Sequence, residues 1–388
     1  MSIAVIGGGI AGVAAAHELA RSGERATVFH QHAGASALYS GALDFEVWDR
    51  VSALSVVDPA LAEFSSALGI WELGSAAPRV ATFEGNVRPA RGRDRALLDL
   101  ERCAGKRVAV IDLDRDDWDG PLLAKSFAGS AWAVDTHTKF EAVRVRGLQH
   151  NFERRTSVYD FAAAHDLPER FAFLLAALRA SNAAPDAWLC GPWLGVERAV
   201  AAELSASLGV PVGETTSAPG GAAGARFESA RDRLLSRVAA VERARVLRIT
   251  ANAGAFRVEV EPGDARDFSA VVLATGGVTA GGVALERSFE RRGGAGFRLS
   301  FAAPVAIELG GEVTEGVSSL SSIDFVERGL GALLEVGVAV GEDGAARGAP
   351  GLFVAGDASA GRPRTALVAA QAGLSAAQRA LAHVRRTE

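Results

Sequence analysis

The stretch SIAVIGGGIAGVAAAHELA, residues 2–20, decides the fold. Its first five residues form a short apolar run typical of a buried strand, and the apolar periodicity from about Ile10 to Ser22 predicts a helix. Gly23 marks the expected helix end, and a second strand is predicted from Arg25 to Phe29. The order strand, glycine turn, helix, strand is typical of a parallel α/β sheet.

The turn of this unit carries the spacing G-x-G-x-x-G at Gly7, Gly9 and Gly12. We expect Gly7 to permit the tight turn, Gly9 to let a diphosphate approach the backbone, and Gly12 to let helix and strand pack closely. The N–H groups of the helix start, at Ile10 and Ala11, would then face the phosphates. The spacing predicts a Rossmann-like FAD/NAD(P)-binding domain, and the alternative is a tight turn that binds no ligand.

The end of the second predicted strand lacks the usual partner of that glycine loop. A dinucleotide-binding unit normally has an Asp or Glu there, which binds the ribose of adenosine. Here the residues are Phe29, His30 and Gln31. Three explanations stay open: His30 binds the ribose hydroxyls as a neutral acceptor, the adenosine half is held otherwise, or the ligand has no adenosine.

Two later segments repeat the pattern of a buried strand that ends in small residues. VVLATGG, residues 271–277, places Ala274, Thr275 and Gly276 after a strand. GLFVAGDAS, residues 351–359, places Gly356 and Asp357 before a helix. We expect the Asp357 carboxylate to accept hydrogen bonds from a ribityl chain, which favours a flavin over NAD. The alternative is an ordinary helix N-cap.

Between these segments the pattern changes, and we expect a second α/β domain inserted into the first. Its predicted strands include residues 107–113 and 187–190, with a hairpin over residues 79–92. Predicted helices lie at residues 59–68, 159–180 and 195–208. The flavin-binding domain is thus predicted to comprise residues 1–47, 225–300 and 340–388. Residues 48–224 and 301–339 are assigned to an inserted substrate, cap or partner-binding domain.

Composition excludes several classes of protein. The 388 residues are 49% hydrophobic and 22% charged, with a net charge of −5, which disfavours a nucleic-acid-binding protein. Cys103 and Cys190 are the two cysteines, so the chain has no cysteine-ligated zinc or iron–sulfur site of its own. Two distant cysteines fit a reducing cytoplasm. We expect neither a signal peptide at the glycine-broken N-terminus nor a transmembrane segment.

The three motifs, in this order, resemble the FAD-dependent two-motif flavoproteins. Within that superfamily, three further stretches resemble the B subunit of anaerobic glycerol-3-phosphate dehydrogenase. They are SALYSGALDF at 36–45, APGGAAGARF at 218–227 and TAGGVALER at 279–287. The similarity extends over most of the chain and is patchy in the middle block.

This resemblance implies a flavin-bearing subunit that works beside other oxidoreductase subunits. Electrons would pass to an iron–sulfur partner and a quinone at the inner face of the membrane. By position, it places Ser36, Ser40 and Gly41 near the flavin diphosphate or ring. It places Gly281, Gly282, Glu286 and Arg287 on the opposite side. FAD is the expected cofactor and FMN the alternative, because His30 replaces the ribose carboxylate.

Other interpretations of these residues remain. Ser36 and Ser40 would satisfy loop backbone groups in any fold, and Glu286 with Arg287 would form a surface pair on a helix. The catalytic base is not identified, and His137, His150 and Arg287 are the candidates. Besides a dehydrogenase subunit, the sequence is compatible with a non-catalytic flavoprotein-fold subunit. It is equally compatible with a stand-alone flavin-dependent oxidase of a small organic substrate.

Overall fold

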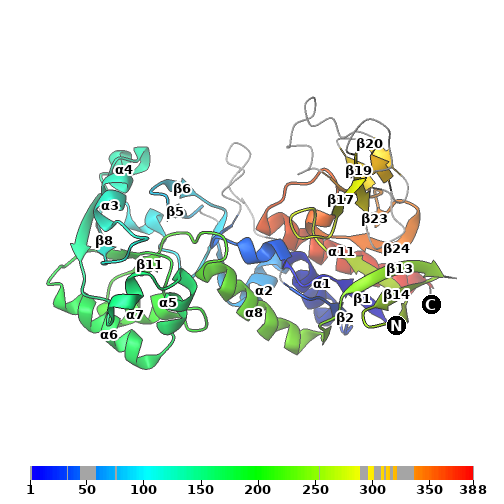
Figure 1. Ribbon diagram of the computed structural model, residues 1–388, viewed down its shortest axis with the longest axis horizontal. Helices are drawn as coiled ribbons and strands as arrows, with labels where there is room; N and C mark the ends of the chain where they lie inside the picture. Colours follow the sequence, from blue (N-terminus) through cyan, green and yellow to red (C-terminus); the bar gives the residue numbers. More distant parts are fainter. Residues whose placement is uncertain are drawn as a thin grey trace. The chain divides into compact units, whose positions relative to one another are not determined.

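The structure is a computed structural model that describes residues 2–32, 34–43, 58–74, 77–252, 254–288, 296–300, 307–309, 312–314, 318–320 and 336–387. The chain divides into two compact units (Figure 1). Unit 1 comprises Met1–Ser36 and Arg231–Glu388, and unit 2 comprises Ala37–Ala230. The predicted domain boundaries stay a prediction, since much of 301–339 lies outside the described residues.

The core of unit 1 is a six-stranded sheet in the order β12-β2-β1-β16-β24-β23. Strands β12, β2, β1, β16 and β24 run parallel, and β23 is antiparallel to β24. Their bounds are β1 Ile3–Ile6, β2 Thr27–Phe29, β12 Ala240–Glu242, β16 Ala270–Leu273, β23 Ala345–Ala346 and β24 Ala349–Val354. The predicted Rossmann-like α/β fold is confirmed.

Two helices of unit 1 that lie far apart in the sequence pack against each other. They are α1 (Ile10–Arg21) and α11 (Ala366–Thr387), drawn in blue and red in Figure 1. A Cβ added to Gly373 of α11 would lie 2.1 Å from the Ala11 carbonyl oxygen. The amide of Gln378 donates to the buried carboxylate of Glu18 at 3.0 Å. Small residues thus let the two backbones approach closely.

The other face of the sheet packs on an antiparallel meander of β13 (Val246–Asn252), β14 (Ala255–Val260) and β15 (Asp264–Phe268). The rings of Phe29 and Phe268 meet edge to face at 5.8 Å within this core. The remaining described strands of unit 1 form two three-stranded sheets. They are β17 Ala284–Ser288, β18 Gly296–Ser300 and β21 Ser318–Leu320, and β19 Ile307–Leu309, β20 Glu312–Thr314 and β22 Gly337–Val338.

Unit 2 is built on a parallel sheet in the order β11-β10-β8-β9. Its strands are β8 Arg107–Asp112, β9 Lys139–Arg144, β10 Ala187–Cys190 and β11 Val212–Glu214. Its helices are α2 Pro59–Leu68, α3 Gly120–Ala128, α4 Ala131–Thr136, α5 Val158–Ala164, α6 Pro168–Ala180 and α7 Val200–Leu208. Helix α8 (Ala222–Val238) continues from unit 2 into unit 1. Smaller sheets pair β3 Ala42–Leu43, β7 Gly92–Asp94 and β4 Trp71–Leu73, and the predicted hairpin β5 Arg79–Ala81 with β6 Val87–Pro89.

Local signals explain where several of these helices begin and end. Helix α2 starts at Pro59 after Asp58, whose carboxylate accepts from the Ala60 N–H at 2.9 Å, and it ends at Gly69 in the left-handed conformation. The predicted helical region 159–180 contains two helices, because α6 begins afresh at Pro168.

The helix predicted from residue 195 begins only at Val200. The backbone N–H groups of Val196, Glu197 and Arg198 all donate to the Asp166 carboxylate instead of entering a helix. Each of these bonds joins residues about 30 positions apart in the chain, so the helix start could not be set by local sequence alone.

Candidate cofactor-binding site

The strand order of unit 1 reverses at β1. The chain leaves β1 through α1 to β2 on one side, and returns later to β16 on the other side. In open parallel sheets, ligands bind outside the carboxyl ends of the strands at such a switch point. Four adjacent strands end there and are followed by Gly7, His30, Ala274 and Ala355. The segments that the sequence singled out therefore meet at one edge of the sheet.

The glycine loop is closely packed by its neighbours. Gly7 has φ 115°, a conformation that favours glycine, and a Cβ there would lie 2.1 Å from the Ala274 carbonyl oxygen. A Cβ on Gly12 would lie 1.9 Å from the Gly7 carbonyl oxygen. Gly9 is the N-cap of α1 in an extended conformation, and no side chain caps the helix from that position. The loop thus leaves the helix N-terminus free of its own side chains.

Ser36 reaches the same helix N-terminus from the turn Gly34–Leu38. Its Oγ accepts a hydrogen bond from the Ile10 N–H at 3.0 Å. On the other side, a Cβ on Gly356 would lie 2.8 Å from the Ala11 Cβ. The structure therefore brings Ser36, Ile10, Ala11 and Gly356 together around the first turn of α1.

His30 occupies the position where a ribose-binding carboxylate is usual. It is buried, and its ring packs on Gly8, where a Cβ would lie 2.6 Å from His30 Cγ. Its Nδ1 has no hydrogen-bond partner among the described residues. Burial, followed by the charge of Arg231, lowers the pKa of His30. The imidazole is therefore neutral at neutral pH, and suits hydroxyl groups as donor and acceptor.

Sequence reasoning missed Arg231, a buried residue of α8. Its Nη1 donates to the Gly8 carbonyl oxygen at 3.4 Å, and its Nη2 forms an ion pair with Asp232 at 2.8 Å. Arg243 lies 3.7 Å from the same carboxylate. Two guanidinium groups thus share one carboxylate beside the glycine loop, which favours an anion there.

The loop after β16 contains a polar atom that nothing in the described chain satisfies. The Oγ1 of Thr275 is buried and has no hydrogen-bond partner among the described residues. Gly276 has φ 78°, and a Cβ on Gly282 would lie 2.1 Å from its carbonyl oxygen. The segment 279–283 therefore packs directly on Thr275 and Gly276. Buried hydroxyl groups are normally hydrogen-bonded, so Thr275 is a candidate ligand contact.

Asp357 lies in a short 3₁₀ turn, Gly356–Ala358, directly after β24. Helix α11 begins at Ala366, so Asp357 is not its N-cap and that alternative interpretation is wrong. Burial raises the pKa of Asp357, against the opposing charge of Arg364. A partly buried carboxylate that caps no helix is suited to accept hydrogen bonds from ligand hydroxyls.

Four other sequence-predicted residues belong to unit 2. Ser40 and Gly41 belong to unit 2, where the Ser40 carbonyl oxygen accepts from Ser217 N–H and that of Gly41 accepts from the Tyr39 hydroxyl at 3.0 Å. His137 and His150 are exposed residues of unit 2.

Glu286 and Arg287 lie in strand β17, so the interpretation as a surface pair on a helix is wrong. The side chains of these two residues lie outside the described part of the structure. Their predicted place opposite the flavin therefore stays a prediction.

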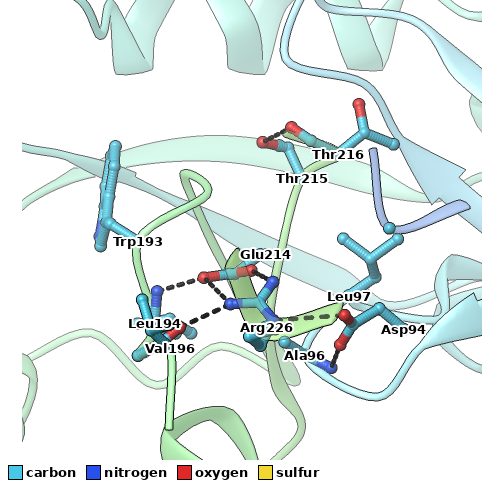
Figure 2. A network of polar contacts seen from close by, with 12 residues as sticks. Asp94, Ala96, Leu97, Trp193, Leu194, Val196, Glu214, Thr215, Thr216 and Arg226 are labelled. Atoms are coloured by element: carbon cyan, nitrogen blue, oxygen red, sulfur yellow. Dashed lines mark hydrogen bonds and ion pairs between the residues drawn. The ribbon is translucent and has the colours of Figure 1, made fainter. Parts of the chain in front are cut away.

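A buried ion network in unit 2 was also missed (Figure 2). The guanidinium of Arg226 pairs with the carboxylates of Glu214 at 2.5 Å and Asp94 at 3.2 Å, and it donates to the Gly195 carbonyl oxygen at 2.7 Å. Glu214 also accepts from the Leu194 N–H. Burial raises the pKa of Glu214 to about 7 despite the neighbouring arginine. The single signal in the sequence was a glutamate in an otherwise apolar strand.

The described residues include no cluster of histidine, cysteine, aspartate and glutamate side chains suited to a metal ion. No helix among them is both long enough and apolar enough to cross a membrane. The polar groups at the switch point are instead hydroxyl, imidazole, carboxylate and backbone N–H groups. This set matches an organic ligand that carries phosphates and hydroxyl groups.

Comparison with known proteins agrees with this assignment of the first segment. Residues 5–49 match the family described as NAD(P)-binding Rossmann-like domain. No curated protein matches the sequence.

Among solved structures, the chain is similar to glycine oxidase from Geobacillus kaustophilus, with 14% identity, a TM-score of 0.34, and coverage of 100% of this chain and 95% of that one. It is also similar to the GidA-related protein from Thermus thermophilus, with 11% identity, a TM-score of 0.34, and coverage of 98% and 97%. A third is CabE, an aromatic hydroxylase from angucycline biosynthesis, with 12% identity, a TM-score of 0.36, and coverage of 99% and 63%. Scores this low establish neither a shared activity nor a shared ligand. The chain is thus assigned a Rossmann-like α/β fold, on the match over residues 5–49 and on its own sheet topology.

Proposed function

We propose that this chain is a flavin-dependent oxidoreductase whose unit 1 binds FAD. The observation that carries the proposal is the meeting of the Gly7 loop, Thr275 and Asp357 at the carboxyl ends of β1, β16 and β24. A glycine loop and helix N-terminus suit a diphosphate. A carboxylate at the end of a neighbouring strand suits a polyhydroxyl chain.

Each residue has a specific task in this proposal. The loop Gly7–Gly12 binds the diphosphate through backbone N–H groups, and Ser36 fixes the start of α1. Asp357 accepts hydrogen bonds from the ribityl hydroxyls, and Thr275 binds a polar edge of the cofactor. A bound flavin supplies reversible two-electron acceptance, while the protein supplies binding, orientation and charge.

The adenosine half distinguishes FAD from FMN. Neutral His30 can exchange hydrogen bonds with ribose hydroxyls, and Arg231 offers positive charge beside the loop. These contacts support FAD. The absence of a carboxylate after β2 supports FMN as the second candidate, because FMN has no ribose to bind there.

The finer proposal is a dehydrogenase subunit similar to the B subunit of anaerobic glycerol-3-phosphate dehydrogenase. Cys103 and Cys190 are both buried and form no cluster-binding motif. Electron transfer from the flavin would therefore need a partner such as an iron–sulfur subunit, or a quinone. The support for this step is the resemblance of residues 36–45, 218–227 and 279–287 to that family.

A titration tests the cofactor assignment. Protein freed of small molecules is mixed with FAD or FMN, and binding is followed by flavin fluorescence and the visible spectrum. We expect saturable binding of FAD, weaker binding of FMN, and loss of both with Gly9→Asp, which puts a carboxylate at the diphosphate position. Protein that binds neither flavin contradicts the proposal.

A second experiment separates the dehydrogenase subunit from a stand-alone oxidase. Affinity purification from the native host should recover an iron–sulfur subunit together with this chain. Peroxide formation by the isolated flavin-loaded chain, without such a partner, would instead favour the oxidase.

A further inference from the structure

Unit 2 contains a second parallel sheet with its own switch point. Strands β8 and β10 are neighbours, with Val108 beside Ala187. The chain leaves β8 for β9 on one side, and then reaches β10 on the other side. The carboxyl ends of β8 and β10 therefore mark the place where a ligand binds in such a sheet.

The loops that follow these two strands carry Arg115 and Trp193, and both pack on Phe161 of α5. The Phe161 ring is 1% exposed. The Arg115 guanidinium carbon lies 4.5 Å from its centroid, and the Trp193 ring lies 5.8 Å from it. Trp118 meets Trp193 edge to face at 4.9 Å. The switch point is thus lined by aromatic side chains.

Two further polar residues surround the same ring. The guanidinium carbon of Arg170 lies 5.7 Å from the Phe161 centroid, and the His165 ring lies 4.7 Å from it. Both residues are almost completely buried, Arg170 at 5% exposure and His165 at 0%. Four side chains that carry nitrogen-bound protons therefore lie around one buried phenyl ring.

Several polar atoms of this cluster are buried without a hydrogen-bond partner among the described residues. They are Nε and Nη1 of Arg170, Nε1 of Trp193 and Nε2 of His165. The Nδ1 of His165 lies 3.1 Å from the Trp193 carbonyl oxygen, which can only accept, so Nδ1 carries the proton of the neutral ring. Burial lowers the pKa of His165 to about 4. Buried polar groups without a hydrogen-bond partner are rare in native proteins and call for a ligand or water.

The cluster also contains more buried cations than buried carboxylates. The side chains of Arg115 and Arg170 are 0% and 6% exposed, whereas Glu153 is the one similarly buried carboxylate that the described residues place beside them. Arg115 is satisfied by Asp117, which is 43% exposed, and by the carbonyl oxygens of Glu153 and Thr156. Within the described part of the chain, Arg170 has a single ion-pair contact, to Glu153 at 3.4 Å. Arg170 is therefore the cation with donors to spare.

We infer that unit 2 holds a second small-molecule site at this switch point, where Arg170 and the Trp193 indole N–H bind the oxyanion of a small carboxylate or phosphate ligand. Phe161 and Trp118 provide the apolar wall beside the anion. The site lies entirely within unit 2 and does not depend on the flavin proposed for unit 1.

The loop that presents Trp193 is held in place by charged groups. The next residue, Leu194, donates its N–H to Glu214, and the Gly195 carbonyl oxygen accepts from Arg226 (Figure 2). Asp166 accepts from the N–H groups of the three residues that follow. A loop fixed by these contacts positions the indole before a ligand arrives, which lowers the entropic cost of binding.

Calorimetric titration of the whole purified protein tests the site, with inorganic phosphate and benzoate as separate probes. We expect saturable binding of at least one probe, and the stronger probe identifies the anion. Arg170→Gln should weaken binding at least about tenfold, because a hydrogen bond to a charged group is lost. Trp193→Phe keeps an aromatic ring but removes the indole N–H. It should weaken binding of the probe about threefold to tenfold.

Two controls locate the binding. Arg179→Gln removes an exposed arginine from the same helix as Arg170 and should leave the affinity unchanged. Arg257→Gln removes an exposed arginine from unit 1 and should also leave the affinity unchanged. Saturation by neither probe, or binding that survives Trp193→Phe and a folded Arg170→Gln, overturns the inference. If Arg170→Gln does not fold, the probe affinity of Trp193→Phe alone decides whether the inference stands.

Discussion

The Ser36 hydroxyl oxygen accepts a hydrogen bond from the Ile10 N–H at 3.0 Å, which joins the loop after β2 to the first turn of α1. The two residues are 26 positions apart, and the contact lies at the glycine loop. Ser36 thus satisfies one of the N–H groups that a helix start leaves unpaired.

Replacing this hydroxyl should affect both stability and cofactor binding. We expect Ser36→Ala to lower the free energy of unfolding by about 1 kcal/mol, the usual effect of losing a cap. Flavin affinity should fall about threefold, because the first turn of α1 is less well fixed. Denaturant unfolding and flavin titration measure the two effects. Ser22→Ala, at the other end of α1, is the matched control and should leave flavin affinity intact.

Two glycines of the loop should respond differently to the same substitution. A Cβ on Gly12 would lie 1.9 Å from the Gly7 carbonyl oxygen, so Gly12→Ala should destabilise the protein by at least about 2 kcal/mol. Gly9 has φ −78° and ψ −172°, which any residue adopts. Gly9→Ala should therefore fold normally but bind flavin about tenfold more weakly, since its methyl group faces the diphosphate. Equal flavin affinity of Gly9→Ala and wild type would show that no phosphate approaches Gly9.

Asp357 allows a binding role to be separated from a structural one. Its pKa is raised by burial, so the ionised form is disfavoured in the folded state. Asp357→Asn should thus unfold at the same denaturant concentration as wild type or a higher one. Its flavin affinity should fall about 10-fold to 100-fold, because hydrogen bonds to a charged acceptor are lost. The exposed Asp267→Asn serves as control. A loss of stability without a loss of affinity would assign Asp357 to the fold alone.

The raised pKa of Glu214 leads us to expect that the free energy of unfolding depends on pH. Burial raises its pKa from 4.5 to about 7, so the folded state keeps a proton that the unfolded state releases above pH 4.5. The contribution of Glu214 to stability is therefore present below pH 4.5, decreases as the pH rises to about 7, and is constant above that. The full change is up to about 3 kcal/mol.

This dependence is isolated by comparing wild type with Glu214→Gln. The difference in unfolding free energy between the two proteins, measured from pH 4 to pH 8, should shift in favour of Glu214→Gln as the pH rises. A difference that is flat across this range would mean that Glu214 is ionised throughout, as the close Arg226 would favour.

Elements whose signals lie close together in the sequence were predictable, whereas features that depend on distant residues were not. The opening unit was predictable because strand, turn and helix signals lie within residues 2–29. The strands predicted at 107–113 and 187–190 and the helix predicted at 59–68 rest on equally local signals. The structure confirms them as β8, β10 and α2, with β8 ending one residue earlier, at Asp112.

Contacts between distant segments were not predictable. Arg226 pairs with Asp94, which lies 132 positions away, and nothing near either residue marks the pair. Arg231 reaches Gly8 across 223 positions. The start of α7 depended on Asp166, 30 positions earlier than Val196. The helix interpretation of Glu286 and Arg287 failed because their charges suited a surface helix as well as a strand.

The most direct test of the central claim is the identity of the small molecule that the purified protein releases on denaturation. The proposed function predicts a yellow protein that releases about one FAD per chain, identified by chromatography and mass. A colourless protein that releases no flavin, and takes up neither FAD nor FMN after purification, would contradict it.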